Sequence, residues 1–358
     1  MPDLPTPDFS FDPKVPGACI AGVRPFRHGS YRLDAESDAG KFIVHNYGHG
    51  GCDITLSWGC ADKVRGIVRD HLVGSPAAEV AVLGAGVMGL TAATLLLDLG
   101  LRVTIYSDRK PDETTSHKAG GQWAVSVMEF AGKEAELSEI VAFAYKRFTA
   151  DIGASFGVSQ RPNYTASRSH NLEVVLQLVP GLIPEPVALP RLPFQGHSKP
   201  GFRYETLLIE PPIFLKKLET DLLARGVVFE TRKFRDRAQV VASCPQEIII
   251  NCTGLGAMTL WNDPKMVPIK GQLAMLPAQP GLDYLYGQDG YMFPRADHLV
   301  IGGTFESGVN NETPSMKDCA ALVDHIKSLF GLGIVKPLPD KHIHNVRNAP
   351  FVNPTLGN

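Results

Sequence analysis

The stretch EVAVLGAGVMG, residues 79–89, carries the clearest indication of fold class in the chain. Its first five residues, Glu79–Leu83, are mostly small and branched apolar residues, and the run ends at a glycine. This pattern predicts a buried strand. We expect a helix over residues 87–99 and a second strand over residues 101–106. Together they form a β–α–β unit with a glycine-rich turn after its first strand.

The glycines of this turn lie at positions 84, 86 and 89, a spacing typical of loops that bind a dinucleotide. They allow a tight turn, a close approach of backbone N–H groups to a pyrophosphate, and close packing of helix on strand. Asp108 follows the second strand, where an acid accepts hydrogen bonds from a ribose hydroxyl. A turn without a ligand is the alternative, which the flanking strand and helix disfavour. The motif alone does not distinguish NAD from FAD.

Two further stretches favour FAD. Residues 114–123 read TTSHKAGGQW, in which hydroxyls can bind phosphate oxygens and small residues let the backbone approach a flat ring. Residues 248–254 read IIINCTG, a buried strand that ends in a glycine turn. An open α/β sheet places a second cofactor contact at such a strand end. Each stretch alone is compatible with an ordinary turn, but their joint occurrence indicates an FAD site.

The composition excludes several function classes. The 358 residues are 44% hydrophobic and carry a net charge of −2, so no basic field exists to hold nucleic acid or an anionic membrane. The six cysteines include no CxxC pair, which favours reduced thiols over a disulfide framework. No apolar run has the length of a spanning helix, and residues 1–17 lack the pattern of a secretory signal. We therefore expect a cytoplasmic enzyme.

Other parts of the chain give weaker structural signals. Residues 18–60 read as strands and turns that end at residues 54–58, and residues 60–74 have helical spacing. Residues 160–205 are rich in proline and are predicted to be loop. The further predictions are helices over 133–152, 212–225 and 316–330, strands over 227–234 and 247–251, and antiparallel strands over 267–305 with turns at 277–281 and 295–298.

Motifs spread over most of the chain resemble the D-amino acid oxidase family of flavoproteins, which includes the D-aspartate oxidases. The matching stretches are GVRPFR, HNYGHGGCDITLSWGCA, VLGAGVMGLTAA, YSDR, TTSHKAGGQW, IIINCTG, IKGQ and YMFPRADHLVIGGTF. The combination of GVRP with HNYGHGG and SWG is far more specific than a glycine-rich loop. The resemblance leaves out the two ends and residues 133–200, and it implies that the cofactor is FAD.

The order of these motifs departs from the family. GVRP and HNYGHGG lie near the C-terminus of family members, whereas here they occupy residues 22–60 and precede the β–α–β unit. The resemblance therefore implies a circularly permuted α/β chain, with a Rossmann-type FAD-binding domain and a substrate domain built on a mixed, largely antiparallel sheet. A cut in an exposed loop leaves packed elements intact, so such a rearrangement is physically reasonable.

The resemblance divides the chain into five parts. These are an N-terminal extension over 1–17, a segment with the substrate-carboxylate and flavin-covering motifs over 18–75, an FAD-binding domain over 79–132 and 228–272, a substrate domain over 133–227 and 273–330, and a C-terminal tail over 331–358.

The resemblance also implies a substrate site. Arg24, in GVRP, matches the arginine that binds the substrate carboxylate, and a guanidinium fork suits such a bidentate contact. Arg27 and Arg32 are its competitors, and a surface arginine is the alternative. Tyr291 matches the active-site tyrosine, whose hydroxyl would bond the carboxylate, against the alternative of a core tyrosine.

The remaining implied contacts surround the flavin. Gly51 would offer a backbone carbonyl to the substrate amine, and Gln122 would lie where flavin and substrate meet. The loop over residues 50–55 would meet the pyrimidine edge, where donors stabilise the negative charge of reduced flavin. Asp53 departs from many relatives and would either put a negative charge near the flavin or face solvent. The expected cofactor contacts are Gly50, Gly51, Cys52, Asp53, Ile54, Thr55, Gly84, Gly86, Val87, Met88, Gly89, Ser107, Asp108, Arg109, Thr115, Ser116, Gly120, Gly121, Gln122, Phe234, Thr253 and Gly254.

No metal site is predicted, because His45 and His49 lack a further matched set of ligands and are expected to serve as hydrogen-bonding residues. The predicted electron acceptor is O₂. No nucleic acid or membrane partner is expected, and homo-oligomerisation stays open.

The resemblance implies an FAD-dependent oxidase of a D-amino acid that yields an imino acid and hydrogen peroxide. Residues 277–290 contain no arginine or lysine, which favours a neutral over an acidic substrate side chain. Arg27, His28 or Arg295 would reverse that preference if one of them faced the substrate. Three alternatives stay open: an oxidase of glycine, sarcosine or another secondary amine, a flavin dehydrogenase with an acceptor other than O₂, and a flavin-free binding protein.

Overall fold

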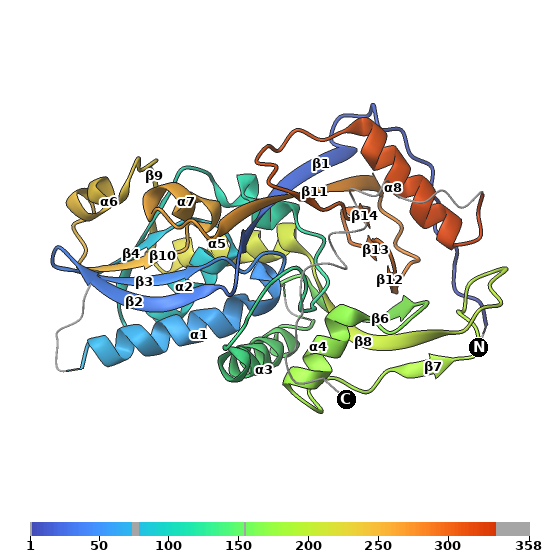
Figure 1. Cartoon of the computed structure of the whole chain (residues 1–358), viewed down its shortest axis with the longest axis horizontal. Helices are drawn as coiled ribbons and strands as arrows, with labels where there is room; N and C mark the ends of the chain where they lie inside the picture. Colours follow the sequence, from blue (N-terminus) through green and yellow to red (C-terminus); the bar gives the residue numbers. More distant parts are fainter. Residues whose placement is uncertain (1, 74–78, 154, 334–358) are drawn as a thin grey trace.

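A computed structural model describes residues 2–73, 79–153 and 155–333 of the chain, which fold around two sheets (Figure 1). The first sheet has six strands in the order β2-β3-β10-β4-β5-β9. All neighbours run parallel except β2 and β3, which form an antiparallel pair. The strands are β2 (Arg32–Asp38), β3 (Lys41–Tyr47), β10 (Ile248–Asn251), β4 (Glu79–Leu83), β5 (Arg102–Ser107) and β9 (Val228–Thr231).

The six-stranded sheet is covered on both faces, which explains the unbroken apolar runs of its central strands. On one face, Val80, Val82 and Ile250 pack in the cluster that contains helices α1 (Asp53–His71) and α2 (Val87–Leu97). On the other face, Ala81 and Ile249 pack against α6 (Arg237–Ser243) and α7 (Ala257–Leu260). The predicted β–α–β unit is thus confirmed as β4, α2 and β5.

The second sheet has nine strands, in the order β1-β11-β14-β13-β12-β6-β8-β7 with β15 beside β11. It is mainly antiparallel, and β12 pairs with β6 in parallel. Helix α8 (Met316–Leu329) covers part of it. The strands are β1 (Cys19–Arg27), β6 (Val158–Thr165), β7 (Val187–Leu189), β8 (Gly201–Ile209), β11 (Met266–Pro277), β12 (Leu285–Gly287), β13 (Tyr291–Pro294), β14 (His298–Gly302) and β15 (Glu306–Ser307).

Two predictions of local structure are wrong. Residues 54–58 are not a strand but the first turns of α1, which begins at Asp53. Ile54 through Ala61 are all buried, so this part of the helix carries an apolar run without helical periodicity. Residues 160–205 are not a loop, since they contribute most of β6, helix α4 (His170–Leu178), β7 and the start of β8.

The other predicted helices are confirmed as α3 (Glu134–Ala150), α5 (Pro211–Ala224) and α8. Strand β9 is shorter than predicted and ends at Thr231. Strand β11 belongs wholly to the nine-stranded sheet, so it crosses the domain boundary predicted at residue 272. Residues 74–78 and nearly all of the tail predicted at 331–358 lie outside the described residues.

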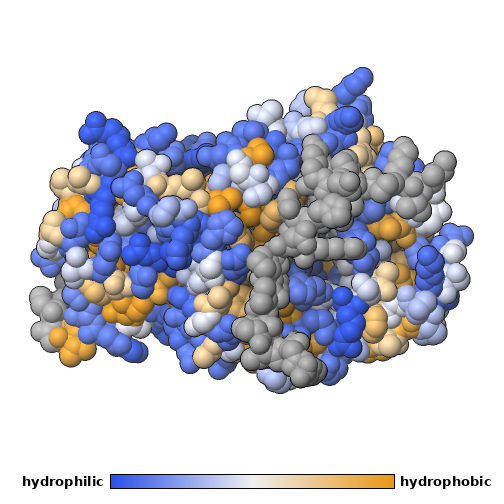
Figure 2. All heavy atoms as spheres, in the orientation of Figure 1, coloured by the Kyte–Doolittle hydropathy of each residue, from blue (hydrophilic) through white to orange (hydrophobic). Residues whose placement is uncertain are grey.

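The surface is mixed in character. Figure 2 shows hydrophilic side chains over most of one face, with hydrophobic ones in small groups between them. The large exposed apolar residues come from many elements, among them Val15, Val187 and Leu223. In the described part of the chain, no helix combines the length and apolar character needed to cross a membrane.

Two glycines of α1 generate a stability prediction. A Cβ atom at Gly59 would lie 2.1 Å from the Ile140 carbonyl oxygen of α3, whereas one at Gly66 would meet nothing within 4 Å. We expect Gly59→Ala to destabilise the protein by about 1–3 kcal/mol because α1 and α3 must separate. Gly66→Ala should stabilise it by about 0.5–1 kcal/mol through helix propensity. Thermal denaturation of both variants checks this, and equal midpoints would contradict the close packing of α1 on α3.

Candidate active site

Two adjoining cavities lie at the carboxyl ends of the parallel strands and between the two sheets. One has a volume of about 730 Å³ and the other about 820 Å³. Asp53, Thr115 and Ser116 line both of them, so the two cavities offer one extended path. We call the first the ring cavity and the second the dinucleotide cavity, after the parts of FAD that each would hold.

The dinucleotide cavity is built on the glycine-rich turn. A Cβ atom at Gly84, whose φ is +103°, would lie 2.5 Å from the Cys252 carbonyl oxygen. One at Gly89 would lie 2.0 Å from the Gly84 carbonyl oxygen, so these two positions require glycine if α2 is to pack on the sheet. Helix α2 directs its N-terminus into the cavity, where Val87 N–H donates to Ser116 Oγ at 3.1 Å. Such a helix end is suited to a pyrophosphate.

The rest of this cavity carries groups suited to a nucleotide. Ser107, Asp108 and Arg109 line it after β5, and Thr253 and Gly254 line it after β10. Phe234, an expected cofactor contact, also lines it together with Lys233. Asn46, which sequence reasoning did not include, is fully buried in this wall, and its Oδ1 has no hydrogen-bond partner within the described chain. An acceptor left over in this way fits the hydroxyls of a bound cofactor.

The ring cavity is lined by backbone-rich segments. Gly120, Gly121 and Gln122 form one wall, and Gly50, Gly51, Ile54 and Thr55 form another. Gln122 Nε2 is buried without a hydrogen-bond partner among the described residues. Thr55 is held in place because its hydroxyl donates to the Ala124 carbonyl oxygen at 3.0 Å. These features fit a flat ring that approaches backbone closely and meets the free amide of Gln122.

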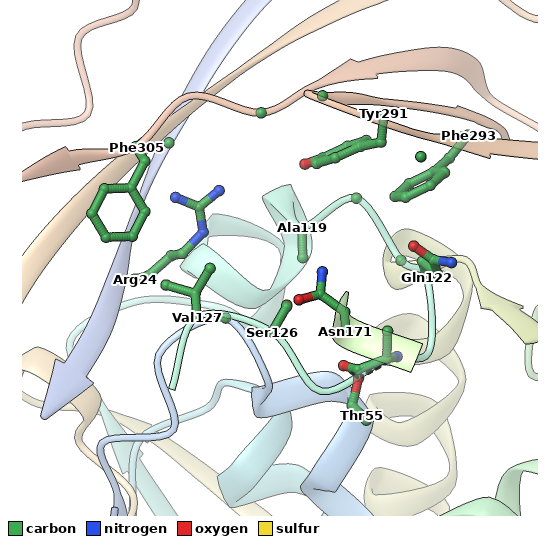
Figure 3. A pocket seen from close by; sticks show the side chains of 18 of the residues that line it. Arg24, Thr55, Ala119, Gln122, Ser126, Val127, Asn171, Tyr291, Phe293 and Phe305 are labelled. Atoms are coloured by element: carbon green, nitrogen blue, oxygen red, sulfur yellow. Dashed lines mark hydrogen bonds between the residues drawn. The ribbon is translucent and has the colours of Figure 1, made fainter. Parts of the chain in front are cut away.

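Arg24 and Tyr291 meet at the far end of the ring cavity (Figure 3). Arg24 Nη1 donates to the Thr304 carbonyl oxygen at 3.1 Å, and the Tyr291 hydroxyl points toward the guanidinium. Burial raises the pKa of Tyr291, and the Arg24 charge partly opposes that shift. Tyr291 therefore keeps its proton near neutral pH, and both side chains can donate to one carboxylate.

Glycines make room for this pair. A Cβ atom at Gly271 would lie 2.4 Å from both terminal nitrogens of Arg24, and one at Gly302 would lie 2.2 Å from the Tyr291 ring. The other side of the Tyr291 ring stacks on Phe293, with centroids 4.3 Å apart. Arg24 and Tyr291 are therefore fixed by backbone that cannot carry side chains at these points.

The competing cations are engaged elsewhere. Arg27 pairs with Asp263 at 2.8 Å, and Arg32 pairs with Asp34 at 3.0 Å. Arg295 forms a bidentate pair with Asp297 at 2.8 and 2.6 Å. None of these three lines the ring cavity. His28 is 62% exposed and also lies outside the lining.

Some predicted contacts have different surroundings. Cys52 lines neither cavity, and its thiol donates to the Ser126 carbonyl oxygen at 2.8 Å. His45 bonds Glu36 and Asn251, and burial lowers its pKa to about 4. His49 is fully buried and faces Asp53 at 3.4 Å. No cluster of three or more potential metal ligands occurs in the ranges that the structure describes.

Sequence reasoning missed one wall of the ring cavity. Asn163, Ser167, Asn171 and Gln288 line it, and three of them come from the region predicted to be loop. The parallel pairing of β12 with β6 brings these segments together, and no local motif announces such a pairing.

Comparisons with known proteins agree with this site. The family profile of FAD-dependent oxidoreductases named DAO matches residues 79–347. The chain is 31% identical over 264 residues to the D-amino-acid oxidase of Streptomyces coelicolor. The aligned region covers 70% of this chain and 77% of that relative. It is 27% identical over 269 residues to human D-aspartate oxidase, and that aligned region covers 70% of this chain and 76% of the human protein.

Solved structures share the fold. Glycine oxidase from Bacillus cereus superposes with a TM-score of 0.53 at 16% identity, over 70% of this chain and 77% of that one. L-amino acid deaminase from Proteus vulgaris gives a TM-score of 0.53 at 14% identity, over 72% and 75% of the two chains. At these identities, the likeness shows the common architecture alone.

The close approach of Gly271 to Arg24 predicts that a side chain at position 271 would weaken carboxylate binding. Gly271→Ala would displace the Arg24 guanidinium, so the affinity for benzoate should fall by about tenfold or more. Gly281→Ala is the matched control, because a Cβ atom there meets nothing within 4 Å. Calorimetric titration of both variants provides the measurement. An unchanged affinity in Gly271→Ala, with the fold intact by circular dichroism, would rule out Arg24 as the carboxylate anchor.

Proposed function

The chain belongs to the DAO family of FAD-dependent oxidoreductases, and on that basis we propose that it oxidises a D-amino acid with O₂ as electron acceptor. The observation that carries this proposal is the Arg24–Tyr291 pair at the end of the ring cavity. It forms a fixed carboxylate site beside the space for the flavin. An amino acid has the carboxylate that such a site would hold.

The protein's own residues bind and orient the substrate. Arg24 and Tyr291 hold the carboxylate, and this contact sets how Cα faces the ring. FAD held along the two cavities, by the glycine-rich turn at one end and by Gln122 and the loop over residues 50–55 at the other, would supply the redox chemistry, the transfer of a hydride's two electrons from Cα to O₂ to give hydrogen peroxide. The substrate amine loses a proton and becomes the imine, which water hydrolyses to a 2-oxo acid and ammonia.

The wall opposite the anchor favours a neutral side chain that can form hydrogen bonds. Figure 3 shows Asn171 and Thr55 across the cavity from Arg24 and Tyr291. Asn163 Oδ1 in the same wall is buried without a partner among the described residues. Arg168, the nearby cation, pairs with Glu173 at 2.9 Å. The wall thus offers uncharged polar groups to the substrate side chain, and the Arg168 charge is already balanced by Glu173.

A peroxide assay over amino acid enantiomers tests this function. We expect turnover of D-serine and D-asparagine with a kcat/KM about tenfold or more above that for D-aspartate, and no turnover of the L-enantiomers. Peroxide should form in equal amount to the 2-oxo acid. Turnover confined to glycine or sarcosine would favour a secondary-amine oxidase. Reduction of an artificial dye without peroxide would favour a dehydrogenase, and a purified protein that cannot take up FAD would contradict the proposal.

We also propose that the chain is circularly permuted relative to its family. The family match begins at residue 79 and leaves out β1, β2, β3 and α1, although these elements belong to the two sheets and the site. The start of the described chain lies beside the end of α8, where Phe9 and Phe330 have ring centroids 5.5 Å apart (Figure 1). An uncut family chain would connect these two places.

A relinked chain tests the permutation. The variant begins at residue 79, runs to residue 333, and continues through a short Gly–Ser linker into residues 7–73. Because every helix and strand that the structure describes is kept, we expect it to fold, to bind FAD and to keep wild-type activity within about threefold. The same chain without residues 7–73 is the control and should lose FAD. A relinked chain that cannot fold would contradict the proposal.

A further inference from the structure

Asp53 lies where the ring cavity and the dinucleotide cavity adjoin. It is the first residue of α1, and its side chain is only 19% exposed. It lines both the ring cavity and the dinucleotide cavity. The sequence left open whether Asp53 faces solvent. In the structure it lies at the junction of the two cavities proposed to hold FAD.

The chemistry of FAD indicates which atoms meet this junction. The ribityl chain is the link between the pyrophosphate and the ring, and it is attached at N10. The neighbouring N1 and C2 carbonyl oxygen carry the negative charge of the reduced flavin. A group on the wall shared by both cavities would therefore lie near the ribityl chain and the N1 edge of a bound FAD.

Within the described ranges, no arginine or lysine forms an ion pair with Asp53. Its neighbour is the imidazole of His49, with Nδ1 at 3.4 Å from the carboxylate. That ring stacks on Tyr31, with centroids 5.2 Å apart, and its Nε2 lies 3.5 Å from Cys60 Sγ. The backbone N–H groups at the start of α1 supply partial positive charge, which the Asp53 carboxylate offsets.

The field of Asp53 also reaches the cavity wall. Cys252, which lines the dinucleotide cavity, has its pKa raised to about 12, chiefly by burial. A hydrogen bond with Asn46 opposes this shift, and the Asp53 charge adds to it.

We propose that Asp53 is a tuning residue that lowers the electron affinity of the bound flavin. A fixed negative charge at the N1 edge opposes the charge that develops there when two electrons and a proton arrive as hydride. It opposes equally the negative charge left on the ring when sulfite adds to N5. The effect makes reduction by substrate less favourable and the return of electrons to the acceptor more favourable. This inference rests on FAD as the cofactor and on no particular substrate.

The test measures the flavin without any substrate. In the FAD-loaded Asp53→Asn variant, the sulfite Kd, read from loss of flavin absorbance, should fall on the order of tenfold. The two-electron midpoint potential, read by equilibration with a reference dye, should rise by about 30 mV, the equivalent of that tenfold change. Asp53→Glu, which keeps the charge, should stay close to wild type.

Asp70→Asn is the matched control, since Asp70 lies at the opposite end of α1 and is 69% exposed. It should leave both values unchanged. The proposal is overturned if Asp53→Asn keeps the wild-type sulfite affinity and potential, or if Asp53→Glu changes them as much as Asp53→Asn does. If Asp53→Asn loses FAD, Asp53→Ser takes its place with the same expected shifts. Failure of every D-amino acid as substrate would overturn the proposed function and leave this result standing.

Discussion

The placement of the Arg24 charge in the wall of the ring cavity constrains the rest of the site. In the described part of the chain, Arg24 forms no ion pair with a carboxylate. Its Nη1 donates to the Thr304 carbonyl oxygen, and the Tyr291 hydroxyl points toward the guanidinium. A partly buried guanidinium without a counter-ion is costly, and an anionic ligand would offset that cost. Burial accordingly lowers its pKa. The glycines at 271 and 302 let the backbone pack directly against the Arg24 guanidinium and the Tyr291 ring, which fixes both side chains.

This anchor links the two sheets. Strand β1 carries Arg24 along β11 of the nine-stranded sheet, and the chain then enters the six-stranded sheet through β2 and β3. Helix α1 follows and brings Asp53 to the junction of the cavities. One N-terminal segment thus carries both Arg24, the proposed substrate anchor, and Asp53, the proposed tuning charge.

Local signals explain what the sequence could predict. The unit of β4, α2 and β5 was predictable because an apolar run and three spaced glycines leave few alternatives, and Arg24 and Tyr291 were identified through motifs rather than geometry. The start of α1 was missed because burial on every side removes helical periodicity. The wall with Asn163 and Asn171 was missed because it depends on pairing between β6 and β12, which lie far apart in sequence. The orientation of Asp53 likewise follows from where α1 begins.

The central claim is that Arg24 holds the substrate carboxylate while the flavin takes the hydride. Rapid mixing of the FAD-loaded protein with a D-amino acid in the absence of O₂ tests it most directly, by the loss of flavin absorbance. The account predicts saturable reduction in the wild type. In Arg24→Lys, it predicts an apparent substrate Kd raised by more than about tenfold with an unchanged flavin spectrum, because lysine lacks the planar fork. Equal substrate affinity in the two proteins would contradict the account.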